Sequence, residues 1–341
     1  MIMSATPALL ADIGATNARF ALSDGREITA EHILKCADYA DIRDAITAYV
    51  NLAAPGTMPD CGAFAIACPV LGDHVAITNH PWQFSITGLQ ECFGFNTLQV
   101  VNDFAATAMA VPSLDRDYLR EITTDNRIPA TKEPIGVLGP GTGLGVASLV
   151  YDGAAYRPVP GEGGHVSVPV HTQREFAIVR ALHNQGHAHV SAERVCSGPG
   201  LENIYQALCT IEARRDLPAR TAEEISQAGG DGKCPVCAEA LEHMFVWLGR
   251  VAGDLALTIG ARGGIYIAGG VAVELSDSLM RSGFHAAFHA KGRFCDYLAR
   301  IPCYLIDHHY SAFIGLNRLV NETKSEYTTR DGFAPRSRFR I

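Results

Sequence analysis

Short apolar runs alternate with helical patterns over the first hundred residues. The runs predict strands at 8–12 and 19–23, joined by a turn that contains Gly14, and further strands at 62–67 and 98–101. Apolar residues at three- and four-residue spacing predict a helix at 42–52, and a helix of small residues follows at 104–110. Strands that are followed by interleaved helices and strands indicate a mixed sheet covered by helices.

Beyond Val190 the pattern becomes helical. It predicts helices at 201–214, 221–227, 235–259 and 311–320, and strands at 265–268 and 304–306. The tail from Asn321 is polar and contains Arg330, Arg336, Arg338 and Arg340. We expect a solvated or loosely docked end, with a basic contact site as the alternative.

Two segments resemble each other. ALLADIGATNARFALSDG and IGVLGPGTGLGVASLVYDG each read as an apolar strand, a Gly/Thr turn, a second apolar strand and an Asp-Gly turn. The likeness predicts two domains of common origin, each opening with such a hairpin. The alternative is that any two hairpins with glycine turns look alike.

Length and charge narrow the class of protein. A chain of 341 residues suits two domains, and 48% hydrophobic against 19% charged residues indicates a compact globule with a large core. The 28 basic and 36 acidic residues give a net charge of −8, so the overall field repels phosphate backbones. We expect no nucleic acid partner, and any phosphate ligand must be held locally.

No segment reads as a membrane span or a secretory signal. The uncharged run between Glu133 and Asp152 is rich in glycine and proline, which indicates a hairpin, and no basic residue precedes the first apolar run. We therefore expect a cytoplasmic protein with no membrane partner, whose ten cysteines are thiols. Cys234 and Cys237 form the one CxxC pair. Because no second pair follows at zinc-site spacing, we favour two small thiol side chains beside a helix that Pro235 opens, with metal or redox use as the alternative.

Three glycine-rich turns follow apolar strands. The P-loop pattern GxxxxGK[ST] is absent, and GPGTGLG from Gly139 does not match GxGxxG and precedes a strand, so P-loop and Rossmann proteins are poor matches. In DIGATNAR, Gly14 allows a sharp turn, Thr16 and Asn17 present amides, and Asp12 is placed to hold Mg²⁺ directly or through water. One such hairpin alone would be structural. Two of them, with a Gly-Gly pair after a later strand, suggest opposed hairpins that grip a polyphosphate between domains.

Polar residues form a second group. Asn102 and Asp103 follow a strand at the edge where ligands bind in open α/β sheets, although Asp103 alone would also suit a helix N-cap. Glu162 and His165 lie in PGEGGH, and Glu193 precedes the turn SGPG. Carboxylates, an amide and an imidazole suit a ligand with several hydroxyl groups, but each residue alone is also typical of an ordinary loop.

These residues belong to longer blocks that resemble a known family. LADIGATNARFAL, AFAIACPVLGDHVAITNHPWQFS, VVNDFAATAMA, GPGTGLGVA, PGEGGHV, SAERVCSGPG, GGIYIAGGV and GFHAAFHAKGRF look, in this order, like the bacterial ATP-dependent glucokinases, between about residue 8 and residue 320. Those enzymes share a fold group with actin and heat-shock chaperone ATPases. The resemblance implies two ribonuclease-H-like α/β domains with a ligand cleft between them and extra helices in the larger one. It also implies a homodimer that transfers the γ-phosphoryl group of ATP to the 6-hydroxyl of glucose.

The resemblance also assigns roles and boundaries. Asp103 resembles the catalytic base. The sugar ligands are implied to be Asn102, Asp103, Gly143, Glu162, His165 and Glu193. The implied ATP site comprises Asp12, Gly14, Ala15, Thr16, Asn17, Gly141, Thr142, Gly143, Gly269 and Gly270, with Mg²⁺ at Asp12, through water. The implied domains are a small one of 1–112 plus 310–322, a large one of 113–309, and a tail of 323–341.

The sequence departs from the family at two places. The first hairpin of the family usually carries two consecutive glycines, whereas the second position here is Ala15. We predict an ordinary negative φ at Ala15, because an alanine with positive φ would cost about 1 kcal/mol. The entry to the last helix, HHYSAFIG, is less glycine-rich than in the family, which leaves the base-side contacts of ATP and the packing of that helix open.

Three alternatives remain. Another sugar kinase of this fold would act on fructose, mannose or an amino sugar. A sugar-responsive regulator would need a DNA-binding helix-turn-helix ahead of the first strand, where only about seven residues stand. A zinc-bearing sugar kinase would need a Cys/His cluster; His183, His187 and His189 have no cysteine nearby in the sequence, and we expect them in a surface loop.

Overall fold

The computed structural model describes residues 6–78, 80–122, 127–308 and 310–331, with backbone only for 323–331. The chain forms two compact units, one of Met1–Leu114 with His309–Ile341 and the other of Asp115–His308. Each unit builds its own sheet and its own hydrophobic core.

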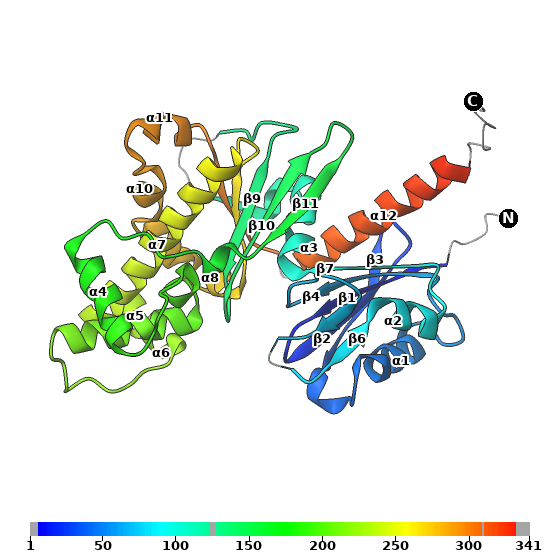
Figure 1. Ribbon diagram of the computed structural model, residues 1–341, viewed down its shortest axis with the longest axis horizontal. Coiled ribbons are helices and arrows are strands. Elements are labelled where there is room, and N and C mark those ends of the chain that lie inside the picture. Colours follow the sequence, from blue (N-terminus) through cyan, green and yellow to red (C-terminus); the bar gives the residue numbers. More distant parts are fainter. Residues whose placement is uncertain (1–5, 79, 123–126, 309, 332–341) are drawn as a thin grey trace, which may run out of the picture. The chain divides into compact units, whose positions relative to one another are not determined.

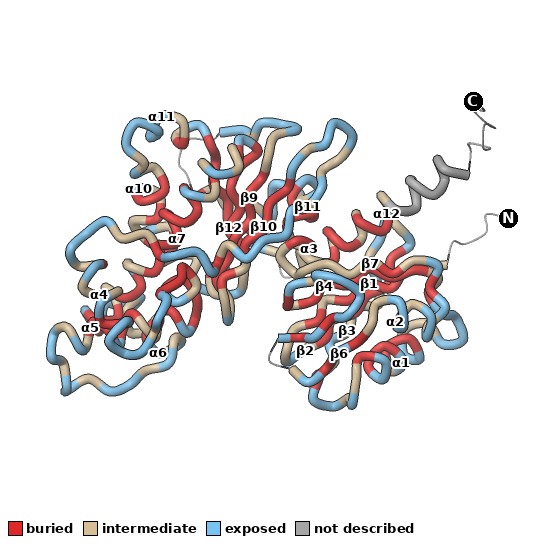
Figure 2. The backbone as a smooth tube through the Cα atoms, in the orientation of Figure 1, coloured by how far each residue is buried: buried red, intermediate tan, exposed pale blue. Residues whose placement is uncertain are grey.

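The first unit contains a five-stranded sheet in the order β3-β2-β1-β4-β7. β1 pairs antiparallel with β2, β2 antiparallel with β3, and β1 and β7 lie parallel to β4 on its two sides. The strands are β1 (Ala8–Ile13), β2 (Asn17–Ser23), β3 (Ile28–Lys35), β4 (Cys61–Ile66) and β7 (Thr97–Asn102), and β5 (His74–Ala76) pairs separately with β6 (Gln83–Ser85). β4 is buried along its whole length, as Figure 2 shows for the centre of the sheet.

Helices cover both faces of this sheet (Figure 1). α1 (Ile42–Ala53) begins at its N-cap Asp41 and packs on β2 and β3 through residues at three- and four-residue spacing. α3 (Asp103–Ala110) and α12 (Ser311–Asp331) pack against each other and against β4. A Cβ atom at Gly315 would lie 1.8 Å from the carbonyl oxygen of Ala106, so α12 needs glycine there to approach α3 closely. A further α-helix of this unit is α2 (Ile86–Phe93).

The second unit repeats the topology of the first. Its sheet has the order β11-β10-β9-β12-β13-β8, with antiparallel pairing of β9 with β10 and β10 with β11, and parallel pairing of β9 with β12 and β12 with β13. β8 adds an antiparallel edge strand. The strands are β8 (Leu119–Glu121), β9 (Ile135–Pro140), β10 (Leu144–Tyr151), β11 (Tyr156–Gly161), β12 (Ile265–Ile267) and β13 (Cys303–Ile306). The shared strand order supports the common origin that the paired hairpins predicted.

Extra helices surround this second sheet. α7 packs on β9 and contacts α5, α6 and α10 (Figure 1). The helices are α4 (Gln173–Asn184), α5 (Gly198–Ile211), α6 (Ala222–Gly230), α7 (Pro235–Ile259), α8 (Gly270–Glu274), α9 (Ser276–Arg281), α10 (Phe284–His289) and α11 (Cys295–Leu298). The prediction of two α/β domains, the second carrying additional helices, is confirmed. Within the described part of the chain, every helix is too short or too polar to span a bilayer.

Some predicted boundaries are wrong. α12 continues to Asp331, past the end expected at Val320 and into the segment expected as a tail; residues 332–341 lie outside the described residues. SGPG is the start of α5 rather than a free turn, because Ser197 caps the helix by accepting from the backbone N–H of Gly200. His183 lies in the last turn of α4 rather than in a loop.

Candidate active site

In the first unit, the parallel strands bring the predicted phosphate turn and the predicted base to one sheet edge. Ile13, Ile66 and Asn102 occupy the same register position on β1, β4 and β7, and all three strands end there. Neighbouring strands lie about 4.8 Å apart, so the turn after β1 and the start of α3 are separated by about 10 Å. This is the edge at which open α/β sheets bind ligands.

Asn102, rather than Asp103, is the N-cap of α3. Its Oδ1 accepts from the backbone N–H groups of Phe104 at 3.0 Å and Ala105 at 3.4 Å, and its Nδ2 donates to the Cys68 carbonyl at 3.3 Å. Nδ2 carries a second hydrogen that this bond does not use. The helix-cap alternative for Asp103 is therefore wrong, since the neighbouring residue fills that role.

Asp103 is the first residue of α3 and is partly exposed. Its Oδ1 accepts from the backbone N–H of Phe104 at 2.9 Å, which orients the carboxylate. The positive end of the helix dipole favours a negative charge at this position. Asp103 is therefore an oriented carboxylate at the ligand-binding edge of the sheet.

Asp12 lies at the end of β1 and pairs with Arg19 of β2, whose Nη1 is 3.0 Å from Asp12 Oδ2. Burial raises the pKa of Asp12, while the charge of Arg19 and its hydrogen bond act to lower it. A single carboxylate beside an open turn suits Mg²⁺, which takes one or two protein carboxylates and completes its shell with phosphate oxygens and water. The donor set therefore fits the metal.

The turn between β1 and β2 presents bare backbone. Gly14 N–H donates to the Asn17 carbonyl at 3.0 Å, and a Cβ at Gly14 would meet only that oxygen, at 3.6 Å. Neither Gly14 nor Ala15 has positive φ. The negative φ predicted at Ala15 is confirmed, and the chain turns at Gly14 without a positive φ there. The space beside this glycine is otherwise open.

In the second unit, the turn between β9 and β10 is held by the start of α5. Gly141 N–H donates to the Gly143 carbonyl at 2.8 Å, and Gly198 N–H donates to the Gly141 carbonyl at 2.9 Å. A Cβ at Gly141 would meet nothing within 4 Å, so the turn is open on one side, and Thr142 lies at its tip. The sequence could have indicated the start of α5, because Ser followed by Gly-Pro is a helix-start signal, but it carries no signal for this contact.

The turn after β12 packs against the same hairpin. A Cβ at Gly139 would lie 2.1 Å from the Ala268 carbonyl oxygen, and one at Gly269, where φ is +89°, would lie 2.5 Å from the Pro140 carbonyl oxygen. Gly270 has open space around it. The structure thus brings the two predicted nucleotide-binding turns of this unit into contact.

The four predicted sugar ligands of this unit, Gly143 of the hairpin and three polar residues, lie close together in or near the hairpin. Glu193 Oε2 accepts from Leu144 N–H at 3.0 Å, and a Cβ at Gly143 would lie 2.4 Å from that oxygen. Glu162 is the N-cap of the short 3-10 helix Gly163–His165, and His165 is its last residue. Glu162 Oε2 lies 3.9 Å from His165 Nε2, and both side chains are more than half exposed.

Close packing and a backbone bridge hold these loops together. A Cβ at Gly164 would lie 2.1 Å from the Leu144 carbonyl oxygen, and Ala192 N–H donates to the Val166 carbonyl at 2.8 Å. His189, which sequence reasoning assigned to a surface loop, places Nε2 3.0 Å from the His165 carbonyl oxygen. It therefore supports the loop of a predicted ligand, and sequence alone carries no signal for that contact.

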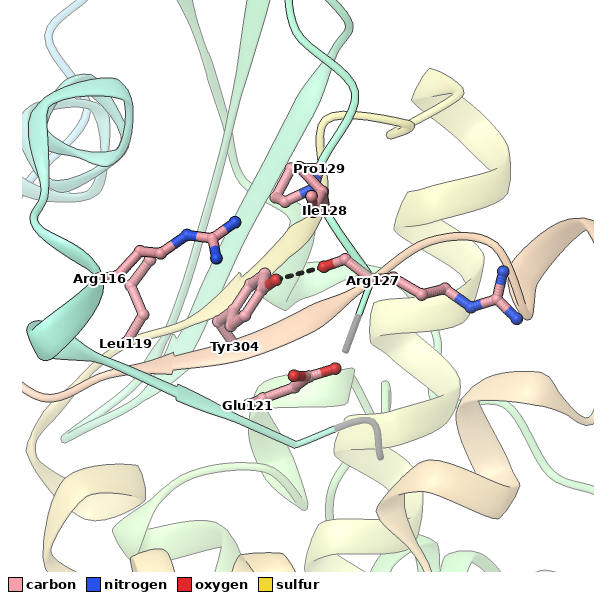
Figure 3. A pocket seen from close by; sticks show the side chains of 7 residues that line it. All are labelled: Arg116, Leu119, Glu121, Arg127, Ile128, Pro129 and Tyr304. Carbon is pink, nitrogen blue, oxygen red and sulfur yellow. Dashed lines mark hydrogen bonds between the residues drawn. The ribbon is translucent and has the colours of Figure 1, made fainter. Parts of the chain in front are cut away.

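A pocket of about 300 Å³ lies elsewhere in this unit, along β8 and β13 (Figure 3). Tyr304 forms its floor and donates to the Arg127 carbonyl at 2.7 Å, while the side chain of Arg127 points away. The lining residues are Arg116, Leu119, Glu121, Arg127, Ile128, Pro129 and Tyr304. None of the predicted site residues lines it.

Comparisons with known proteins agree on one family. The family model for glucokinase matches residues 9–323. A glucokinase of Paramagnetospirillum magneticum is 44% identical over 93% of this chain and 98% of its own, and one of Nitrobacter hamburgensis is 46% identical over 92% and 97%. The crystal structure of a glucokinase from an Antarctic psychrotroph has a TM-score of 0.83 at 34% identity, covering 93% of this chain and 99% of its own. The chain therefore belongs to the glucokinase family, and its activity is the ATP-dependent phosphorylation of glucose.

Proposed function

We propose that Asp103 is the general base that accepts the proton of the glucose 6-hydroxyl while that oxygen attacks the γ-phosphorus of ATP. The observation that carries this proposal is the position of Asp103. Its carboxylate is oriented by a hydrogen bond and lies at the same edge of the sheet as the turn after β1. Phosphoryl transfer needs alignment and charge neutralisation more than covalent chemistry, so one ionised carboxylate within about 3 Å of the hydroxyl is sufficient.

The glucose hydroxyls are held, in this proposal, by Asn102, Glu162, His165 and Glu193, with Gly143 beside them. Two facts support it: Glu193 contacts the β9–β10 turn, and Glu162 and His165 lie on the adjoining loop. A sugar that leaves one of these polar groups buried and unpaired should bind more weakly. Fructose and mannose should therefore be poorer substrates.

ATP is held, in this proposal, by open glycine turns. Gly14, Gly141 and Gly270 each leave room for phosphate oxygens or the nucleoside, and Thr16, Asn17 and Thr142 add polar groups. Asp12 would hold Mg²⁺ through water, and the ion would neutralise phosphate charge. We also propose a cytoplasmic homodimer; Cys196, Cys234 and Cys237 are thiols, as a reducing compartment would keep them.

Replacement of Asp103 by Asn tests the base. We expect turnover to fall by roughly 10²- to 10⁴-fold, the usual contribution of a general base, with little change in glucose KM. A coupled assay for glucose 6-phosphate measures both constants, with fructose and mannose run alongside. Asp44→Asn is the matched control, because Asp44 is an exposed aspartate in the first turn of α1 and should leave turnover unchanged. Near-normal turnover in Asp103→Asn would refute the assignment.

Replacement of Asp12 by Asn tests the metal site. The amide loses the negative charge that attracts Mg²⁺, so we expect the Mg²⁺ concentration for half-maximal rate to rise about tenfold, which corresponds to about 1.4 kcal/mol. Mg²⁺ titrations at saturating ATP and glucose measure this shift, and saturating Mg²⁺ should restore part of the rate. A variant with an unaltered Mg²⁺ requirement would remove Asp12 from the metal site.

A further inference from the structure

The first turn of α7 carries two thiols that the kinase reaction does not use. Cys234 is the N-cap of α7, and its Sγ accepts from the backbone N–H of Cys237 at 3.4 Å. A disulfide requires two α-carbons that lie about 4.4–6.8 Å apart. The spacing of a CxxC pair at a helix start is compatible with that distance. The hydrogen bond from Cys237 N–H places Cys234 Sγ beside the residue with which it would pair.

The two thiols differ in their access to solvent and in the direction in which their pKa is shifted. Cys234 is 7% exposed and Cys237 is completely buried, so a small oxidant reaches Cys234 first. Burial opposes ionisation of Cys234. This effect is outweighed by hydrogen bonds from Cys237 and from backbone N–H groups and by the charge of Arg220, so the pKa of Cys234 is lowered. Burial and the neighbouring Cys234 raise the pKa of Cys237 to about 12.

A cation accompanies the pair. The charge of Arg220 favours the thiolate of both cysteines, and the buried Nε of Arg220 has no hydrogen-bond partner among the residues that the structure describes. An anion in the first turn of α7 would be stabilised by this cation and by the helix dipole. Cys209 of α5 lies close enough to be influenced by Cys234, but burial raises its pKa, so it stays protonated.

We propose that Cys234 and Cys237 form a redox-active dithiol, which a hydroperoxide oxidises to an intramolecular disulfide. The Cys234 thiolate attacks one peroxide oxygen; an S–O bond forms, the O–O bond breaks, and hydroxide leaves. Cys237 then gives up its proton and attacks the sulfur of the Cys234 sulfenic acid; the S–S bond forms and the S–O bond breaks. For hydrogen peroxide, two thiols and one peroxide become one disulfide and two waters, and a dithiol reductant reverses the change.

Peptide mapping of the full-length protein tests this proposal. Reduced protein is treated with limiting hydrogen peroxide near pH 7, and the remaining thiols are alkylated. We expect the peptide containing Cys234 and Cys237 to lose two hydrogens and to become resistant to alkylation. This oxidation should be roughly ten times faster than the oxidation of the exposed Cys92 and Cys295. Oxidation of Cys92 and Cys295 at the same rate or faster would overturn the proposal.

Variants separate the two thiols. In Cys237→Ser, oxidation should stop at a sulfenic acid on Cys234, which dimedone labels. Cys234→Ser keeps a good N-cap residue and should give neither the sulfenic acid nor the disulfide. Cys209→Ser is the matched control and should still form the disulfide. A Cys209–Cys234 crosslink in the native chain, or failure of dimedone to label Cys237→Ser, would overturn the assignment.

Arg220→Gln tests the cation. We expect peroxide oxidation of Cys234 to slow several-fold at pH 7 and to recover near pH 9, because alkaline solution restores the thiolate without the cation. A purely structural role for Arg220 would slow oxidation equally at both pH values, and that result would remove Arg220 from the mechanism.

Discussion

A side chain at Gly143 would displace the flexible end of Glu193. In Gly143→Ala, the Cβ would lie 2.4 Å from Glu193 Oε2, so the carboxylate must move and its hydrogen bond to Leu144 N–H is lost. We expect a roughly tenfold rise in glucose KM and a loss of about 1–3 kcal/mol in the free energy of unfolding, since Leu144 N–H is left without its acceptor. Steady-state kinetics and urea unfolding measure the two effects.

Gly141→Ala in the same turn is the control for stability. A Cβ at Gly141 meets nothing within 4 Å and φ there is not positive, so the unfolding midpoint should be unchanged. Equal stability of the two variants would show that the contact between Gly143 and Glu193 does not constrain the turn.

At the scale of single residues, sequence predicted the candidates but not their contacts. Asn102 and Asp103 were both visible at a strand end, yet only the backbone geometry shows that Asn102 caps α3. Glu193 lies 49 positions from its partner Leu144, and a contact of that range leaves no local pattern. Gly14 and Gly143 read alike in sequence, although the first leaves open space and the second is packed against a carboxylate.

At the scale of elements, a buried ion pair joins α4 to α7. Glu175 is in the first turn of α4, where its Oε2 accepts from the backbone N–H groups of His171 and Thr172 and pairs with Arg250 of α7. In Glu175→Gln, Arg250 keeps a buried charge without its partner, which costs about 3–5 kcal/mol. Asp216→Asn, which breaks an exposed pair with Arg214, should change stability by about 0.5 kcal/mol or less.

The same pair predicts a pH dependence. Burial of Glu175 favours its neutral form, but Arg250 and the backbone donors outweigh this and lower the pKa of Glu175 below its ordinary 4.5. A lowered pKa contributes stability that is present above pH 4.5 and is lost as pH falls through the pKa of the folded state. Urea unfolding between about pH 7 and pH 3 should show this loss in the native chain and lack it in Glu175→Gln. Parallel curves for the two proteins would contradict the prediction.

Elements with a strong apolar period were predicted well. α7 runs from Pro235 to Ile259 as expected, since a proline opens it, Gly260 in the left-handed conformation closes it, and its core face is apolar apart from Arg250. β3 was missed because its side chains alternate only between half-buried and exposed. The last turns of α12 were missed because NETKSEYTTRD is polar on all sides and has no apolar stripe to reveal a helix.

At the scale of the whole molecule, the two hydrophobic cores do not share residues. The residues of one core fall between Ile122 and Leu305 in the sequence, and those of the other fall between Leu9 and Leu98. Each core therefore belongs to a single unit. The predicted site residues are divided as well: Asp12, Asn102 and Asp103 belong to the first unit, whereas Glu162, His165 and Glu193 belong to the second. Sequence predicted the repeated hairpins, and the family resemblance implied the return of residues 310–322 to the first unit, in which α12 lies.

This division predicts that residues 115–308 fold alone and are inactive. The fragment contains a complete core and sheet, so circular dichroism should show cooperative unfolding, while the coupled assay should detect no glucose phosphorylation because Asp103 is missing. Residues 1–114 should not fold by themselves, because α12 covers α3, β1 and β4 and its removal exposes that apolar face to water. Non-cooperative unfolding of 115–308 would contradict the independence of its core, and glucose-dependent turnover by that fragment would contradict the role of Asp103.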